Sequence, residues 1–249
     1  MSIKLIIRFF YQLVLNNRHV STIAFEYFKS VKYIDSNDLN SRFSQSIDQL
    51  GLKYFLQIGA NDGVSGDHLY PQIESNMNCY GILVEPIPYV FEKLKENYKD
   101  KTNFILENVL ISDKPSIEKF YYIDDSVEDS NANVPEYYDQ LGSLIKDSVI
   151  ENGGTACIPF IKSVDLQAVT ITHLLTKHNL RKLDLLYTDT EGHDYIVIKD
   201  LDLNAYNISI ILLEHKHLTF IETIKTVLKL RKKYHLFADG ADLLAIKKP

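Results

Sequence analysis

The segment of residues 56–67, LQIGANDGVSGD, combines glycines with short polar side chains directly behind an apolar run. The chain has ten glycines in all, and three of them lie here, although a tight turn needs one or two. Glycine lets a ligand approach the backbone closely and adopts left-handed conformations at little cost. The segment is therefore interpreted as a ligand-binding loop. The residues expected to contribute are Gly59, Ala60, Asn61, Asp62 and Gly63.

Glu85 closes the apolar run YGILVE and precedes Pro86, about 20 residues after Gly63. In nucleoside-binding sheets an acidic side chain at this distance accepts hydrogen bonds from ribose hydroxyls. The loop lacks the Gly-Lys-Ser/Thr of a P-loop, and its glycines do not have the G-x-G-x-x-G spacing of dinucleotide folds. A nucleoside without a pyrophosphate, such as S-adenosylmethionine, fits this combination. The alternative is an ordinary turn followed by a solvated glutamate.

Carboxylates stand at the ends of four of the five expected buried strands, where open α/β sheets bind their ligands. Such groups, and histidines beside them, accept protons in general base catalysis. Structural or solvated roles are the alternative for each histidine, and a divalent metal shared by Asp189, Glu191 and Glu214 is the less favoured alternative for the carboxylates. The catalytic candidates, in order of preference, are Glu214, His215, Asp189, Glu191 and His193.

The elements that must position these residues alternate between helical and strand patterns. Apolar runs at 54–59, 80–85, 103–111, 183–189 and 208–215 predict buried strands, and amphipathic segments such as 38–50 predict helices between them. This order indicates a doubly wound parallel sheet with helices on both faces. The C-terminal segment HLFADGADLLAIKK predicts an antiparallel hairpin that turns at Asp239 and Gly240.

Residues 112–168 interrupt this alternation and are interpreted as an insert that covers the substrate. Two expected strands, SIEKFYYID and IPFIKSVDLQAV, flank a long polar segment, and a loop of this length is usually functional. Its tyrosines would either edge a saccharide-binding lid or pack internally. They are Tyr121, Tyr122, Tyr137 and Tyr138.

Residues 1–37 are expected to form an amphipathic helical extension outside the domain of residues 38–249. The apolar run is too short to span a bilayer and is broken by Lys4 and Arg8, so it would pack on the protein or contact a membrane surface. The net charge of −6 disfavours nucleic-acid partners. Two isolated cysteines suggest a reducing, cytoplasmic location. The N-terminal helix would provide any peripheral contact with the inner face of a membrane. A homodimer is a plausible assembly.

Three segments resemble signature blocks of the FkbM family of S-adenosylmethionine-dependent O-methyltransferases. They are FLQIGANDGVSGD, GILVEPIPYVFEKLKENY and LLYTDTEGHDYIVIKDLD, and the resemblance extends over residues 52–246. It implies a class I methyltransferase fold, which is Rossmann-like with seven strands, the last antiparallel. The implied activity is methyl transfer to a hydroxyl, most simply of a sugar or a cell-surface glycan. Alternatives are a polyketide-like metabolite as acceptor, or a non-catalytic binding module that kept the fold.

The resemblance also implies roles for individual residues. The glycine loop would hold the methionine part of the cofactor and Glu85 its ribose, whereas Asn108 would lie near the adenine and Asp189 near the reacting centre. The chain departs from the family pattern before this aspartate and after the following helix. The departures are Tyr187 and Thr188 in place of Lys-Ile, and Asp200 in place of glycine.

Overall fold

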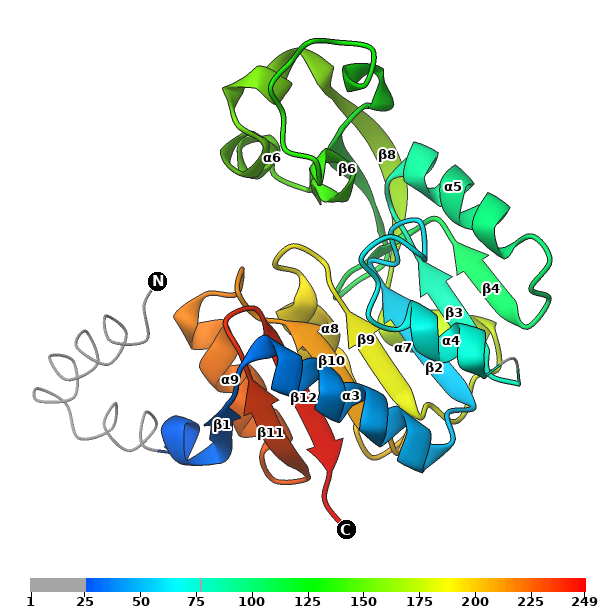
Figure 1. Ribbon diagram of the computed structural model, residues 1–249, viewed down its shortest axis with the longest axis vertical. Coiled ribbons are helices and arrows are strands. Elements are labelled where there is room, and N and C mark those ends of the chain that lie inside the picture. The colour runs from blue at the N-terminus through cyan, green and yellow to red at the C-terminus, as the bar shows by residue number, and fades with distance from the viewer. Residues whose placement is uncertain (1–25, 77) are drawn as a thin grey trace, which may run out of the picture.

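The computed structural model describes residues 26–76 and 78–249, and its largest element is a mixed sheet of eight strands (Figure 1). The strands are β1 (Val31–Tyr33), β2 (Tyr54–Ile58), β3 (Tyr80–Val84), β4 (Phe104–Glu107), β9 (Leu185–Thr188), β10 (Ile210–Glu214), β11 (Tyr234–Ala238) and β12 (Asp242–Lys247). Their order in the sheet is β1-β11-β12-β10-β9-β2-β3-β4. Only β12 runs antiparallel to its neighbours, β10 and β11. The predicted doubly wound methyltransferase-like fold is thereby confirmed, with β1 as an additional edge strand.

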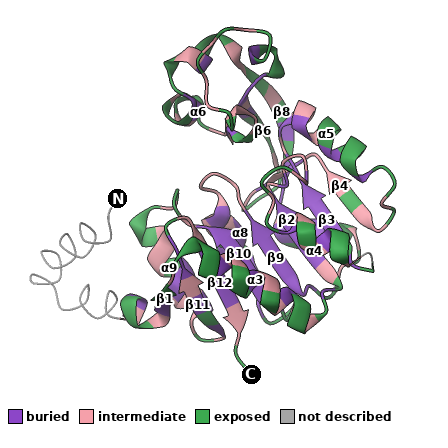
Figure 2. Ribbon diagram, in the orientation of Figure 1, coloured by how far each residue is buried: buried purple, intermediate pink, exposed green. Residues whose placement is uncertain are grey.

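Helices cover both faces of the sheet, as the alternation of elements predicts. One face carries α3 (Ser36–Leu50), α4 (Tyr70–Ser75) and α5 (Pro88–Tyr98), and the other carries α7 (Ile171–Lys177), α8 (Asp194–Asp200) and α9 (Phe220–Leu230). Successive side chains of a strand point to opposite faces. Phe55 accordingly packs in the α3–α5 cluster, and Leu56 packs in the α7–α9 cluster. The central strands are buried along most of their length (Figure 2).

Local capping explains where α3 begins and ends. The Asp35 side chain accepts a hydrogen bond from the backbone N–H of Asp38, and Gly51 ends the helix in the left-handed conformation with φ 64°. The C-terminal hairpin is also confirmed, because β11 and β12 pair around a turn in which Asp239 Oδ1 accepts from the N–H groups of Ala241 and Asp242.

The strand expected over residues 103–111 is wrong in its extent. β4 ends at Glu107, and the chain then bends so that β5 (Leu110–Ile111) joins a different sheet. The bend is held by the Asn108 side chain, whose Nδ2 donates to the carbonyl oxygens of Glu85 and Pro86 at 2.7 and 3.0 Å. The apolar pattern of residues 103–111 contains no signal for such a change of chain direction.

The insert forms a lobe that extends away from the C-terminal edge of the main sheet (Figure 1). Its sheet has the order β5-β8-β6-β7, and the long pair β6 (Ser116–Ile123) and β8 (Ile161–Val169) confirms the two predicted strands. The remaining elements are β7 (Gly142–Ser143), α6 (Lys146–Gly153) and 3-10 helices at Asp125–Val127, Tyr138–Gln140 and Thr155–Phe160.

The segment between the two long strands is therefore more ordered than its polar composition suggests. Val127, Leu141, Val149 and Cys157 form a small buried cluster with Ile123. Tyr121 and Tyr138 pack against this cluster, and Tyr122 lies in the cluster that also holds Phe120. Of the four tyrosines expected to edge a lid, only Tyr137 is largely exposed.

The N-terminal extension expected over residues 1–37 lies mostly outside the described residues. Its described end differs from the expected separate extension, because residues 26–30 are helical and β1 pairs with β11 in the main sheet. None of the described helices is long and apolar enough to cross a membrane.

Candidate active site

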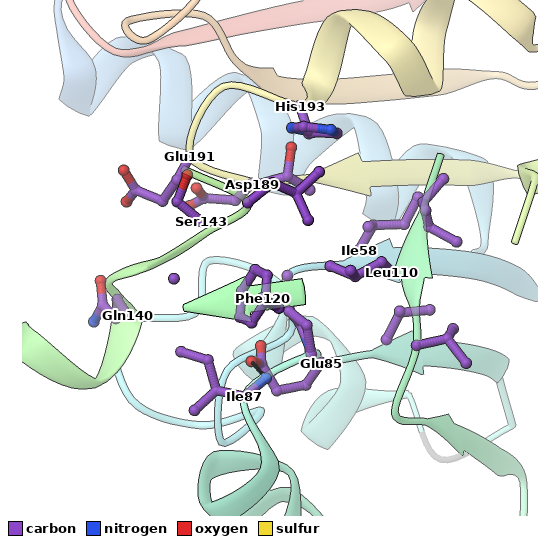
Figure 3. A pocket seen from close by; sticks show the side chains of 18 residues that line it. Ile58, Glu85, Ile87, Leu110, Phe120, Gln140, Ser143, Asp189, Glu191 and His193 are labelled. Atoms are coloured by element: carbon purple, nitrogen blue, oxygen red, sulfur yellow. Dashed lines mark hydrogen bonds between the residues drawn. The ribbon is translucent and has the colours of Figure 1, made fainter. Parts of the chain in front are cut away.

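Two adjoining hollows lie at the C-terminal edge of the main sheet, between the sheet and the lobe. Figure 3 shows the first of them. One is lined mainly by apolar side chains, among them Ile58, Leu110 and Phe120, and the other by polar ones. Residues shared by both hollows make them one continuous site. The shared residues are Gly59, Glu85, Ile87, Gln140, Asp189 and Glu191.

Two glycines of the loop after β2 allow the loop to pack closely against neighbouring parts of the protein. Gly59 has φ +79°, and a Cβ atom there would stand 1.7 Å from the carbonyl oxygen of Asp189. A Cβ at Gly63, with φ +74°, would collide with Leu94 and Tyr98 of α5, and Tyr98 Oη donates to the Gly63 carbonyl at 3.0 Å. Gly63 does not line either hollow. Of the two glycines that were expected to lie against a ligand, only Gly59 lines the hollows.

Polar side chains of this loop provide unused hydrogen-bond acceptors in the second hollow. Asn61 adopts a left-handed backbone with φ 50°, and its Oδ1 is buried without a partner. Oε1 of Gln57 is also buried and unpartnered, while its Nε2 donates to Asp67 Oδ2 at 3.1 Å. Ala60 lines the same hollow. Asp62 instead organises the loop by accepting from the N–H groups of Val64 and Ser65.

Glu85 stands between the two hollows, at the predicted end of β3. Its Oε2 accepts from the Asn61 N–H at 2.9 Å and its Oε1 from the Ile87 N–H at 2.8 Å. Burial raises the pKa of Glu85 to about 7. Pro86 lines the apolar hollow. Asn108 does not line it and acts as the clamp of the Glu85–Pro86 backbone described above.

The loop after β9 brings two of the predicted carboxylates to the opposite side of the site. Glu191 and Gly192 both have positive φ, 51° and 106°, so the chain turns sharply here. The turn is fixed by Asp194, whose buried carboxylate accepts from the hydroxyls of Thr188 and Thr190. A non-glycine residue in this conformation is strained, and such residues cluster at functional sites. Asn61 and Glu191 show this strain on the two facing loops.

The three predicted carboxylates all have raised pKa values, and Glu214 is the most buried of the three. Burial raises the pKa of Asp189, and burial together with the charge of Asp189 raises that of Glu214 to about 9. Burial also raises the pKa of Glu191 to about 7. Asp189 and Glu191 line both hollows, whereas Glu214 lies behind them, outside either lining.

The predicted histidines lie in different places. His193 lines the apolar hollow, and burial lowers its pKa (Figure 3). His215 lines neither hollow: its backbone N–H donates to Ala241, its Nε2 is buried without a partner, and burial lowers its pKa. The structure thus brings Asp189, Glu191 and His193 together at the site, whereas His215 follows β10 and contacts the turn between β11 and β12.

Comparison with known proteins follows this geometry. The family model described as "Methyltransferase FkbM domain" matches residues 57–237. The chain belongs to the FkbM methyltransferase family. The resemblance noted in the sequence is therefore confirmed. Comparison with the curated proteins gives no significant match.

Similar solved structures of this FkbM-family chain are distant in sequence. A methyltransferase FkbM from Methylobacillus flagellatus KT is 10% identical with a TM-score of 0.49, and the alignment covers 78% of this chain and 43% of that one. This chain therefore spans less than half of the M. flagellatus chain. An O-methyltransferase from Bacillus cereus in complex with SAH is 6% identical with a TM-score of 0.43, and the alignment covers 86% and 83% of the two chains.

Several residues of the FkbM-family site escaped the sequence analysis. Gln57 is a polar residue within the apolar run YFLQIG, and this interruption is a signal that could have identified it. Asp67 ends the glycine-containing segment and was not among its expected ligand contacts, whereas it lines the polar hollow. Gln140 and Ser143 come from the lobe and carry no local signal. Tyr187, which departs from the family pattern, mainly packs in the hydrophobic core. Its side chain is buried, and its ring centroid lies 6.3 Å from that of Phe43.

Proposed function

We propose that the protein is an S-adenosylmethionine-dependent O-methyltransferase that acts on a hydroxyl of a sugar or glycan. The observation that carries the cofactor assignment is the set of acceptors in the polar hollow: Gln57 Oε1 and Asn61 Oδ1 are buried and unpartnered, and Asp67 and Glu85 lie beside them. Among the described residues, no Lys or Arg lines either hollow. Such a set suits a ligand with an ammonium, a sulfonium and ribose hydroxyls, and not one with phosphates.

In this proposal each side of the site holds one part of the cofactor. Gln57, Asn61 and Asp67 accept hydrogen bonds from the ammonium of the methionine part. Glu85, already oriented by two backbone N–H groups, accepts from the ribose hydroxyls. Ile87, Leu110 and their apolar neighbours pack against the adenine. The cofactor supplies an activated methyl group on a sulfonium.

The protein's remaining tasks are to orient the acceptor hydroxyl, exclude water and accept its proton. Alignment of the reacting groups contributes about 7–11 kcal/mol in favourable cases, and a general base about 10²–10⁴-fold. Asp189 and His193 are the proposed proton acceptors, because both line the site. The lowered pKa of His193 keeps its imidazole neutral and able to take up a proton near neutral pH.

The acceptor is assigned from the rim of the site and from the family. Gln140 and Ser143 of the lobe and Glu191 of the main domain present hydrogen-bonding groups on facing sides, as recognition of a polyhydroxylated molecule requires. The lobe is proposed to act as the substrate lid. A polyketide-like metabolite is the second candidate, favoured by the apolar wall of Ile87, Leu110 and Phe120.

Calorimetric titration with S-adenosylmethionine tests the cofactor assignment. We expect one molecule to bind per chain, and Glu85→Gln to weaken binding because one backbone N–H would face an amide donor in place of a carboxylate oxygen. The exposed carboxylate Glu151 on α6 offers a matched control, Glu151→Gln, that should bind as the unmodified protein does. Absence of binding at millimolar cofactor would contradict the proposal.

Transfer of labelled methyl to an array of sugars, glycans and polyketide-like compounds tests the acceptor. Asp189→Asn and His193→Ala should retain cofactor binding and lose methyl transfer, whereas His215→Ala should lose less activity because His215 lies outside the site. Methylation restricted to the polyketide-like compounds would reject the carbohydrate assignment. Cofactor binding without transfer to any class would favour a binding module.

A further inference from the structure

We propose that Glu191, Glu214 and His217 bind a divalent cation beside the rim of the site. Each of the three offers a ligand atom, and these atoms all lie within 4.8 Å of one another. His217 Nε2 is 3.0 Å from Glu191 Oε2 and 4.0 Å from Glu214 Oε1. Two carboxylates and an imidazole, from the loop after β9, the end of β10 and the loop after β10, thus lie close together.

The Glu214 carboxylate provides an independent indication of a missing ligand. Its side chain is 3% exposed, and its Oε2 is buried without a hydrogen-bond partner. A buried carboxylate oxygen without a partner is costly, so such an atom in a native protein requires an explanation. This Oε2 belongs to the same carboxylate whose Oε1 faces His217, so a cation that binds this carboxylate can contact both oxygens. A cation bound there would satisfy it.

The ion pair of Lys216 with Glu214 shows that this position attracts positive charge, but the lysine does not occupy the proposed cation site. Its Nζ lies 2.5 Å from Glu214 Oε1, and its side chain is 45% exposed. Lys216 is the one lysine that faces the acidic side chains of Asp189, Glu191 and Glu214 among the described residues that perturb them. The flexible, half-exposed lysine can swing into solvent when a cation with higher charge takes its place.

The ligand set indicates which cation fits. Carboxylate oxygens suit Mg²⁺ and Mn²⁺, and an imidazole nitrogen suits first-row transition metals. Mn²⁺ accepts both kinds of ligand and is the probe of choice. Glu191 also lines both hollows, so the cation would stand next to a bound acceptor and leave coordination positions for its hydroxyls. This last step rests on the proposed function, whereas the metal site does not.

Titration of the full-length, chelator-treated protein with Mn²⁺ tests the site without cofactor or acceptor. Free Mn²⁺ is followed by electron paramagnetic resonance, and we expect one bound ion per chain. Glu191→Gln and His217→Ala should each weaken binding at least about tenfold, since even outer-shell partners of metal ligands change affinity by 10–100-fold. Lys216→Met should tighten binding because it removes the competing cation. Glu151→Gln, on an exposed carboxylate of α6, should bind as the unmodified protein.

A spectroscopic readout separates a specific site from loose attraction to acidic groups. Bound Mn²⁺ should show magnetic coupling to an imidazole nitrogen, and this coupling should disappear in His217→Ala. If Glu191→Gln does not fold, the partly exposed His217 still gives an interpretable variant. Equal Mn²⁺ affinity in Glu191→Gln and Glu151→Gln, or no nitrogen coupling in the unmodified protein, would overturn the proposal. Neither result depends on whether S-adenosylmethionine binds.

Discussion

At the scale of single residues, Glu85 combines burial with two backbone hydrogen bonds and still has lone pairs to offer a ligand. Its pKa of about 7 is high because burial outweighs the two N–H donors. Ribose hydroxyls would donate to the ionised carboxylate and so favour its charged form. The protonation state of this one side chain therefore couples pH to cofactor affinity.

We expect the affinity for S-adenosylmethionine to rise with pH up to about pH 7, the pKa of Glu85 in the free protein. Below the pKa the free protein holds a proton on Glu85 that must leave on binding, so affinity changes by up to about tenfold per pH unit; above the pKa this dependence disappears. Calorimetry at several pH values measures the slope. In Glu85→Gln the slope should vanish, and an unchanged slope there would assign the effect to another group.

Asn61 offers a second test because its backbone strain and its side-chain acceptor can be separated. Glycine at this position keeps the left-handed backbone with φ 50° at no steric cost but lacks Oδ1. Asn61→Gly should leave the free energy of unfolding unchanged or raised by up to about 1 kcal/mol, while cofactor affinity falls. Denaturant unfolding and calorimetry measure the two quantities. Unchanged affinity would show that Oδ1 does not contact the ligand.

At the scale of elements, the contact between the loops after β2 and β9 decides the shape of the site. Gly59 touches the Asp189 backbone so closely that no side chain fits between them. Strand pairing supports this contact, because β2 and β9 are neighbours in register from Phe55 and Leu185 to Ile58 and Thr188. The loop with the unpartnered acceptors and the loop with the carboxylates are thus fixed relative to each other.

Gly59→Ala should destabilise the protein far more than a glycine replacement at an open position. Both Gly59 and Gly51 have positive φ, which costs a residue with a side chain roughly 1–2 kcal/mol, but nothing lies within 4 Å of a Cβ at Gly51. Gly51→Ala should therefore show that backbone cost alone, and Gly59→Ala should exceed it and impair cofactor binding. Urea unfolding of both variants measures the difference, and equal losses would refute the role of the loop contact.

Sequence patterns predicted the elements that are set by local or periodic signals. Apolar runs ending in carboxylates predicted the parallel strands, and Glu85 lies at the end of its strand as expected. The patterns failed where position depends on distant contacts. His217 lies near Glu191 only because the loop after β10 folds toward the turn after β9, and β5 leaves the main sheet because the Asn108 side chain bends the chain. No local spacing encodes either arrangement.

At the scale of the whole molecule, the lobe has a hydrophobic cluster of its own, and a second cluster joins Phe120 and Tyr122 of the lobe to Ile87 and Val90 of the main domain. Ile123, Leu141, Val149 and Cys157 are buried together inside the lobe, whereas the two large clusters lie on the faces of the main sheet. Units with their own apolar contacts open with their own free energies. The lobe nevertheless contributes Gln140 and Ser143 to the site.

Ile123→Ala should loosen the lobe and leave the main sheet intact. A buried isoleucine replaced by alanine costs about 2–5 kcal/mol through lost contacts and the cavity left behind. We expect faster amide hydrogen exchange in α6 and in the 3-10 helix at Tyr138–Gln140, with unchanged exchange in β2 and β9. Ile82→Ala in β3 is the matched control and should accelerate exchange in the main sheet. Accelerated exchange in β2 and β9 upon Ile123→Ala would mean that both parts unfold together.

The long pairing of β6 with β8 has a consequence for how new acceptor preferences arise. The two strands pair continuously from Ser116 and Ala168 to Ile123 and Ile161, so the lobe enters and leaves through one two-stranded ribbon. A segment attached in this way can be exchanged between relatives at a single junction without altering the sheet or the cofactor loops. Because we propose that the lobe is the substrate lid, we expect that grafting a relative's segment between Ile123 and Ile161 changes which molecule is methylated and leaves cofactor binding unchanged.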